Sequence, residues 1–226
     1  MNRLIQQELE AVRNLTGELA TLIEENLQLA LKALMNRDIE LAREVIRRDK
    51  EEIDRQEITL EEKCLRTMAL YHPVAGDLRF LVTVLKINAD LERIGDLAAK
   101  IGDKVIQIAE LDREVYDTGG MKIPERFHAM HEKTVTMLRS TMEAFYHEDT
   151  DLAYKVRLTD DEVDEDKRVI REELEETIAH NPAQHVYLAK LIGVARSLER
   201  IADHCTNICE DVIYMAQGRI VRHEAG

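Results

Sequence analysis

The stretch Leu91-Glu92-Arg93-Ile94-Gly95-Asp96 recurs 107 positions later as Leu198-Glu199-Arg200-Ile201-Ala202-Asp203. Each copy carries a Glu and an Asp four residues apart, among apolar residues at helical spacing. An internal repeat of this kind indicates a duplicated structural unit, so it decides the architecture before any single motif does. We therefore expect two copies of one helical unit, each presenting the same pair of carboxylates.

The match between the two halves extends toward the N-terminus of each copy, but its offset changes. Val45 matches Val156 at an offset of 111, whereas Ile53 matches Val163 at an offset of 110. We interpret such changes as short differences at turns, which leave the order of the elements intact.

Composition indicates an all-α protein. Only 4% of the 226 residues are aromatic, Pro and Gly number 3 and 9, and charged residues make up 34%. Few helix breakers and many charged residues are typical of long helices. The net charge of −14 argues against nucleic acid and anionic membrane surfaces as partners, because both are bound by clustered Lys and Arg. The same charge suits divalent cations or basic protein surfaces.

Three further features bear on the compartment. The N-terminal segment has no apolar signal-peptide core, and no run of about 18 apolar residues occurs. The three cysteines give no disulfide framework, and Cys205 and Cys209 are expected to be buried structural thiols. We therefore expect a cytoplasmic protein without direct membrane insertion.

Apolar periodicity and capping signals divide the chain into six long helices. They are expected at about residues 1–35, 38–71, 73–109, 124–147, 150–178 and 182–217, with the clearest break at Asp117-Thr118-Gly119-Gly120. The predicted fold is all-α, with two tandem, pseudo-symmetric three-helix bundles. The first repeat is predicted to span residues 1–112 and the second 121–218, with a tail at 219–226.

Carboxylates at matched positions form the candidate site. On a helical wheel the acids of each repeated stretch share one face, opposite the apolar stripe. In an antiparallel helical hairpin, residues equidistant from the turn lie level, which adds two acids from the preceding helix to each pair. The candidate metal ligands are Asp49, Asp54, Glu92 and Asp96 in the first half and Asp160, Asp164, Glu199 and Asp203 in the second.

Carboxylates gathered from two helices, with no obligatory cationic side chain among them, repel one another unless a metal ion or a basic partner intervenes. Six acids in the seven residues from Asp160 to Asp166 add to this repulsion. Oxygen ligands favour iron, manganese or magnesium ions over zinc. The first-half site is less complete, because Lys50 stands four residues before Asp54. Either Asp49 substitutes there or that site is degraded.

Two alternatives to a regulatory metal-binding protein stay open. Acidic pairs at this spacing are common on solvated helices, so the chain could be a plain helical scaffold. A carboxylate-bridged metalloenzyme, such as an oxidase or a phosphatase, is the other. A ferritin-like di-iron oxidase is disfavoured because Glu125-Arg126-Phe127-His128 is the only Glu-x-x-His in the sequence. No phosphate-binding loop or G-x-S-x-G nucleophile motif occurs, so we expect no enzymatic activity.

Three stretches, at residues 73–79, 90–96 and 197–210, resemble the PhoU family of phosphate-transport and phosphate-signalling regulators, and the likeness covers essentially the whole chain. The resemblance implies a negative regulator that couples the ATPase subunit of a phosphate importer to a sensor histidine kinase. It also implies surface metal clusters held by Glu92 and Asp96, by Glu199 and Asp203, by Asp160 and Asp164, and by Asp54. Family members commonly form dimers, so a homodimer is expected, although nothing in this sequence specifies it.

Overall fold

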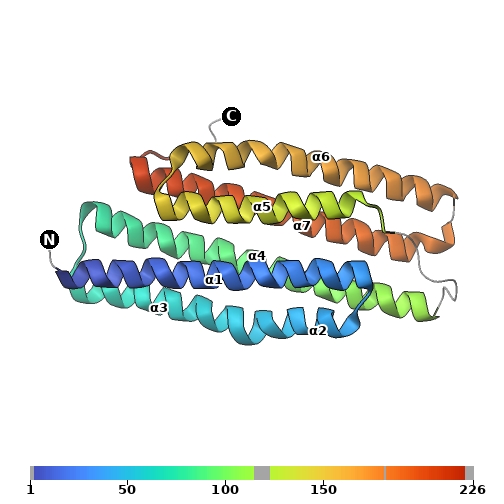
Figure 1. Cartoon of the computed structure of the whole chain (residues 1–226), viewed down its shortest axis with the longest axis horizontal. Helices are drawn as coiled ribbons and strands as arrows, with labels where there is room; N and C mark the ends of the chain where they lie inside the picture. Colours follow the sequence, from blue (N-terminus) through green and yellow to red (C-terminus); the bar gives the residue numbers. More distant parts are fainter. Residues whose placement is uncertain (1–2, 115–122, 181, 222–226) are drawn as a thin grey trace.

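The computed structural model describes residues 3–114, 123–180 and 182–221, and its helices run side by side along one axis (Figure 1). The described residues contain no strand, which confirms the predicted all-α class. The first bundle consists of α1 (Arg3–Asn36), α2 (Ile39–Arg48), the π-helical turn η1 (Asp49–Ile53), α3 (Asp54–Tyr71) and α4 (Ala75–Glu114). The second consists of α5 (Arg126–His147), α6 (Thr150–His180), the short 3₁₀ turn η2 (Pro182–Gln184) and α7 (His185–Gln217).

Side-chain caps fix several helix ends where the sequence predicts them. Asp38 accepts hydrogen bonds from the backbone N–H groups of Glu40 and Leu41, at 2.9 and 3.0 Å, and so begins α2. Asp149 accepts one from Leu152 at 3.0 Å and begins α6. Gly218 ends α7 with a φ of 69°, a conformation that costs glycine little. The predicted break at residues 117–120 lies outside the described residues.

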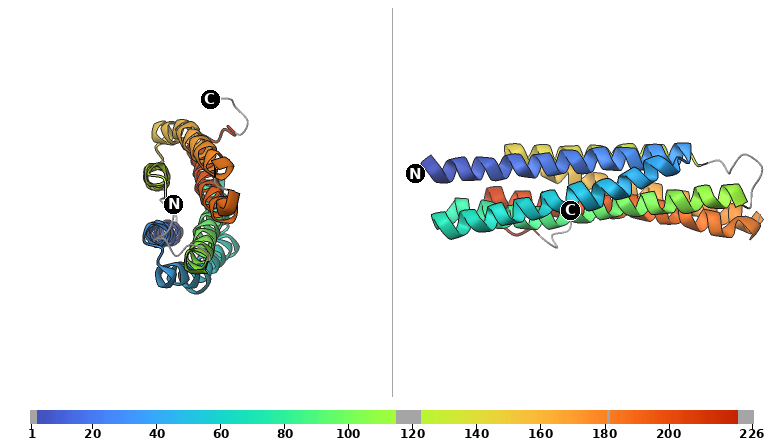
Figure 2. Two further views of the ribbon diagram at one scale, coloured as in Figure 1. Left: turned by 90° about the vertical axis from the view of Figure 1, so that its right-hand side faces the viewer. Right: turned by 90° about the horizontal axis from the view of Figure 1, so that it is seen from below.

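The two bundles lie alongside each other, as the view along the long axis shows (Figure 2). Helix α4 packs along α7, and α1 faces α5 in antiparallel orientation. Polar contacts cross both seams. The Lys86 ammonium lies 3.1 Å from an Asp211 carboxylate oxygen between α4 and α7, and Arg13 of α1 donates to Glu148, the residue that follows α5, at 3.1 Å. The repeats therefore form one continuous side-by-side assembly.

The apolar stripes read from the sequence form the interior. Leu91, Ile94 and Ile101 of α4 are buried, as are their counterparts Leu198, Ile201 and Ile208 of α7. Cys205 and Cys209 are buried too, and burial raises the pKa of the Cys209 thiol to about 12, so it stays protonated. The prediction of buried structural thiols is confirmed.

The second predicted helix contains a π-helical turn that was not predicted. The offset between the repeats falls from 111 at Val45 to 110 at Ile53, which we interpreted as a short difference at a turn. The structure places the five-residue π-helical turn η1 between these residues, inside an otherwise continuous helix. A π turn accommodates about one more residue than an α turn, so the extra residue of the first repeat is absorbed there. This turn carries Asp49 and Lys50.

Among the described helices, none combines the length and the apolar character needed to cross a membrane.

Candidate metal centres

The first acidic cluster lies where η1 and the start of α3 pack against α4. Asp49 and Asp54 come from the first segment, and Glu92 and Asp96 come from α4. Burial raises the pKa of Asp49 to about 6, and the charges of Asp54, Asp96 and Glu92 add to this effect. The four predicted residues are therefore close enough to repel one another, as the hairpin register predicts.

Asp49 is buried, with only 1% of its surface exposed. Gly95 of α4 makes room for it: a Cβ atom there would lie 3.0 Å from Oδ1 of Asp49. Oδ2 of the same carboxylate is buried and has no hydrogen-bond partner. A buried carboxylate oxygen without a hydrogen-bond donor is costly, and the Lys50 ammonium, 3.9 Å away, is too distant to donate to it.

Cationic side chains surround the first cluster on its solvent side. Lys50 Nζ lies 3.9 Å from the nearest oxygens of Asp49 and Asp54, and the lysine side chain is 64% exposed. Arg93 lies 3.3 Å from Glu92 and 3.5 Å from Asp96, and Lys100 lies 3.6 Å from Asp96. These three side chains are more than half exposed, so solvent screens their attraction for the acids.

The second acidic cluster lies between α6 and α7. Burial raises the pKa of Asp160 to about 6, with further contributions from the charges of Asp203, Asp164 and Glu199. Burial also raises the pKa of Asp203, as do the neighbouring charges of Glu199 and Asp164. The four predicted acids of the second half therefore lie close enough to influence one another's charge.

A cationic side chain lies among the acids of the second cluster. Lys167 of α6 lies between the two helices and donates to Asp164 Oδ1 at 2.9 Å and to Glu199 Oε1 at 2.7 Å. Its side chain is only 33% exposed. The spacing of three residues between Asp164 and Lys167 is the sequence signal for this contact, since residues three apart share a helix face.

The donor chemistry of both clusters suits a hard cation, because every candidate ligand is a carboxylate, and in the first cluster Oδ2 of Asp49 has no hydrogen-bond partner. The side chains do not, however, stand in a ligating arrangement. In the part of the chain that the structure describes, no group of three or more His, Cys, Asp and Glu is arranged to hold a metal ion. A cation would therefore require the side chains, including Lys167, to move.

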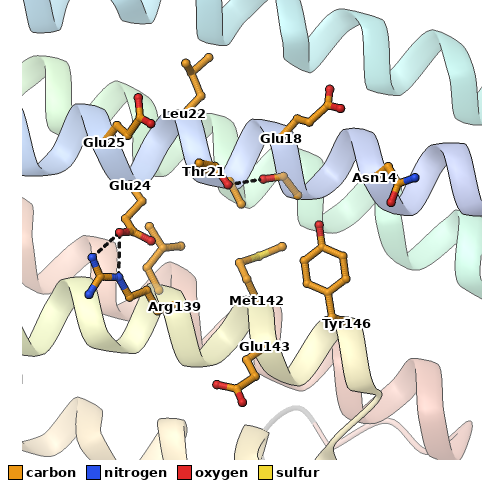
Figure 3. Close-up of a pocket in the computed structure, with 13 residues that line it drawn as sticks. Asn14, Glu18, Thr21, Leu22, Glu24, Glu25, Arg139, Met142, Glu143 and Tyr146 are labelled. Carbon is orange, nitrogen blue, oxygen red and sulfur yellow. Dashed lines mark hydrogen bonds and ion pairs between the residues drawn. The ribbon is translucent and has the colours of Figure 1, made fainter.

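A separate groove of about 720 Å³ runs between α1 and α5 (Figure 3). The ion pair between Glu24 and Arg139, at 2.6 Å, crosses it, and the hydroxyl of Tyr146 occupies the space beside Gly17. Its apolar floor residues Leu138 and Met142 are already buried. The groove therefore offers little further apolar area, and its side chains connect the two bundles without converging on one point.

Comparison with known proteins agrees with this architecture. The PhoU domain matches residues 16–105 and 127–212, one match in each bundle. The chain is 37% identical over 218 residues to the phosphate-specific transport system accessory protein PhoU homolog of Aquifex aeolicus, covering 96% of this chain and 95% of that protein. It is 32% identical over 219 residues to the accessory protein PhoU of Escherichia coli K12, covering 97% of this chain and 88% of the relative.

Solved structures give the same result. The crystal structure of PhoU from Pseudomonas aeruginosa superposes with a TM-score of 0.85 at 33% identity, covering 95% of this chain and 99% of that one. PhoU from Streptococcus pneumoniae, titled a phosphate transport system regulatory protein, superposes with a TM-score of 0.84 at 27% identity, covering 96% and 99% of the two chains. With the duplicated domain, the acidic pairs and these likenesses together, the chain belongs to the PhoU family.

Proposed function

We propose that this chain is a non-enzymatic, cytoplasmic regulatory adaptor of a phosphate-specific transport system. In this role it couples the ATPase subunit of a phosphate importer to a sensor histidine kinase and keeps the phosphate-starvation response off when phosphate is plentiful. The observation that carries the proposal is the family relationship. Relatives that match over nearly the whole chain are named as accessory proteins of such transport systems, not as enzymes.

The proposal includes cation binding at both acidic clusters. Iron, manganese or magnesium ions would suit the all-oxygen donor sets. Burial, followed by the charges of neighbouring acids, raises the pKa values of Asp49 and Asp160, and a cation would relieve the repulsive part of this effect. A bound ion would also change the charge of the outer face of α4 or α7. Phosphate flux through the transporter could then shift the populations of adaptor-bound and free partners.

The partner claim is tested by affinity purification of the tagged chain from phosphate-replete and phosphate-starved cells, after mild solubilisation of the membranes. Mass spectrometry should identify the importer ATPase and the sensor kinase, in proportions that change with phosphate. Recovery of neither component in either condition would refute the adaptor role. Light scattering on the purified protein tests the expected homodimer separately.

The cation claim is tested by elemental analysis of protein purified without added metal. We expect near-stoichiometric metal, reduced in the double variant Glu199→Ala, Asp203→Ala. The matched control is Glu172→Ala, Glu175→Ala, which removes two exposed acids of α6 that pair with Arg168 and Arg171 outside the clusters. Equal metal content in the two double variants would refute binding at the second cluster.

A further inference from the structure

The seam between α4 and α7 has one side that is open to solvent. Helices α1 and α5 pack against these two antiparallel helices from one side, and in the described part of the chain no helix covers the opposite side (Figure 2). We call this opposite side the outer face of the seam. It presents three apolar residues at one end and three cationic residues at the other: Val74, Leu78, Val82, Lys104, Arg196 and Arg200.

The apolar end of the outer face lies at the start of α4. Leu78 and Val82 are four residues apart on one helix face, and they are 41% and 38% exposed. Val74, directly before the helix, is 74% exposed. Adjoining apolar side chains that are exposed to this degree are a common mark of an interaction site. A partner that covered them would gain buried apolar area.

The internal repeat shows that the basic end of the outer face lacks an acid. At the offset of 107, Lys86 corresponds to Gly193, and Lys104 corresponds to Asp211. At one end of the seam the Lys86 ammonium lies 3.1 Å from an Asp211 oxygen. At the other end a Cβ atom on Gly193 would lie 2.6 Å from Cε of Lys104, so the lysine stem lies across α7. No acid among the described residues pairs with Lys104, and its ammonium donates to the backbone oxygen of Lys100 at 3.3 Å.

Two arginines of α7 extend the basic end. Arg196 follows Gly193 by three residues and Arg200 follows Arg196 by four, so these positions share a helix face. Both arginines are exposed, and neither forms an ion pair with a residue that the structure describes. In a chain of net charge −14, a group of unpaired cations on one face is a local departure from an otherwise acidic protein.

The surroundings of Lys104 favour an added negative charge. Burial lowers the pKa of its ammonium, and the adjacent Asp103 only partly opposes this effect. The charges of Lys100 and Lys190 lower the pKa further. An acidic group placed over this end would therefore relieve repulsion among the lysines, in addition to pairing with the arginines.

The distribution of charge decides which kind of partner fits. Glu92 and Asp96 lie beside the outer face on α4, and the exposed Asp203 lies beside it on α7. A flat anionic membrane would approach these acids as closely as the cations, whereas a narrow segment along the seam would avoid them. A second copy of this chain would bring the basic end against another basic end or against an apolar end, and neither is complementary.

We propose that the outer face of the seam docks a helix of a partner protein, apolar at one end and acidic at the other. Lys104 lies 22 residues after Val82, about six helical turns, so both face the same way and the partner helix must be about that long. This inference rests on the adaptor role proposed above and names the chemistry of one partner segment. It does not involve the two acidic clusters.

The test uses full-length protein and a fluorescent helical peptide of about six turns, with Leu on one face of its first third and Glu on the same face of its last third. Fluorescence anisotropy should show salt-sensitive binding. The double variant Lys104→Glu, Arg196→Glu should weaken binding at least about tenfold, because the reversed charges repel the acidic end. Leu78→Ser should weaken it about threefold through lost apolar burial.

The matched control is Lys32→Glu, Arg66→Glu, which reverses two exposed cations of α1 and α3 and changes the net charge equally. This variant should bind the peptide nearly as well as the wild type does. Equal weakening in the two double variants would mean that net charge alone governs binding, and the inference would be wrong. Failure of the wild type to bind the peptide would also overturn it.

Vesicles of phosphatidylcholine and phosphatidylglycerol test the membrane alternative. We expect no binding to them. Vesicle binding that is lost in Lys104→Glu, Arg196→Glu would show that this face recognises a lipid surface, which contradicts the inference.

Photo-crosslinking in cells identifies the natural segment. A photoreactive amino acid at Ala89, an exposed position of α4 seven residues after Val82, should crosslink to a segment with apolar and acidic ends, as read by mass spectrometry. If the wild type and Lys104→Glu, Arg196→Glu recover the importer ATPase and the sensor kinase equally, only this inference fails. If the wild type recovers neither protein, the adaptor role fails with it.

Discussion

Asp49 holds its carboxylate where burial and the charges of Asp54 and Asp96 raise its pKa from the usual 3.8 to about 6. Because the pKa is higher in the folded state, this group contributes stability below about pH 4 and loses that contribution as the pH rises through about 6. We expect Asp49→Asn to raise the free energy of unfolding of metal-free protein at pH 7.5 by on the order of 2 kcal/mol, and to change it little at pH 4. Urea unfolding in chelator at several pH values measures this difference.

The control for this prediction is Glu62→Gln, which removes an exposed carboxylate from α3 of the same bundle. Its free energy of unfolding should follow that of the wild type at every pH. A loss of stability in Asp49→Asn at pH 7.5 would contradict the view that the buried carboxylate lacks a favourable partner.

At the scale of single residues, the sequence predicted the members of both clusters but not how each is held. Glu92, Asp96, Glu199 and Asp203 could be assigned because the spacing of residues on a helix face is local. The burial of Asp49 depends on the π turn and on the space beside Gly95, which arise only when helices pack. The contact of Lys167 with Glu199 crosses two helices, so composition and spacing alone could not decide it.

At the scale of elements, the π turn η1 contains one residue more than an α turn needs. We therefore predict that one residue can be removed there without disturbing the continuous helix formed by α2, η1 and α3. Deleting Lys50 would place Asp49 four residues before Asp54, the same spacing as Asp160 and Asp164 in the second repeat. The π turn would become an α turn, and the residues on both sides would keep their faces. We expect the Lys50 deletion to fold with a loss of stability under about 1 kcal/mol, measured by urea unfolding and circular dichroism.

Deletion of Glu165, an exposed residue in the middle of α6, is the matched comparison. No π turn exists in α6 to absorb the change, so one part of the helix must rotate by about 100° relative to the other. Buried residues such as Val163 and Ile170 could not both stay in the core, and a loss of several kcal/mol is expected. Equal losses for the two deletions would show that η1 is not the site of the extra residue.

The helices and their caps were predictable because the signals for them are local. Apolar periodicity is read within one helix, and the carboxylates of Asp38 and Asp149 bond to backbone N–H groups two or three residues further on. The π turn was not recognised, although its signal was present in the change of offset between Val45 and Ile53. An insertion at a turn and an insertion inside a helix leave the same trace in a sequence comparison. Only the unbroken apolar pattern across residues 42–60 could have favoured the second interpretation.

At the scale of the whole molecule, the two bundles meet along a seam that contains a buried histidine. His131 of α5 is 4% exposed and its Nε2 atom lies 3.4 Å from the backbone oxygen of Leu27 in α1. Its Nδ1 atom is buried without a hydrogen-bond partner. Burial lowers the pKa of His131, and this effect outweighs the opposing contributions of the Leu27 carbonyl and Glu132, while His128 lowers the pKa further.

Because the pKa of His131 is lower in the folded state, its contribution to stability is present above pH 6.5 and is lost as the pH falls below that value. His131→Leu removes the loss of stability at low pH, and it also removes the buried ring nitrogen that has no hydrogen-bond partner. We expect the variant to exceed the wild type in free energy of unfolding by on the order of 1 kcal/mol at pH 5.5, with a smaller difference at pH 8. The stability contributions of Asp49 and Asp160 change in the opposite direction, because they are lost as the pH rises. The quantity to measure is therefore the difference in free energy of unfolding between variant and wild type at each pH. If the difference in free energy of unfolding between His131→Leu and wild type does not grow as the pH falls, protonation of His131 does not destabilise the packing of α5 against α1.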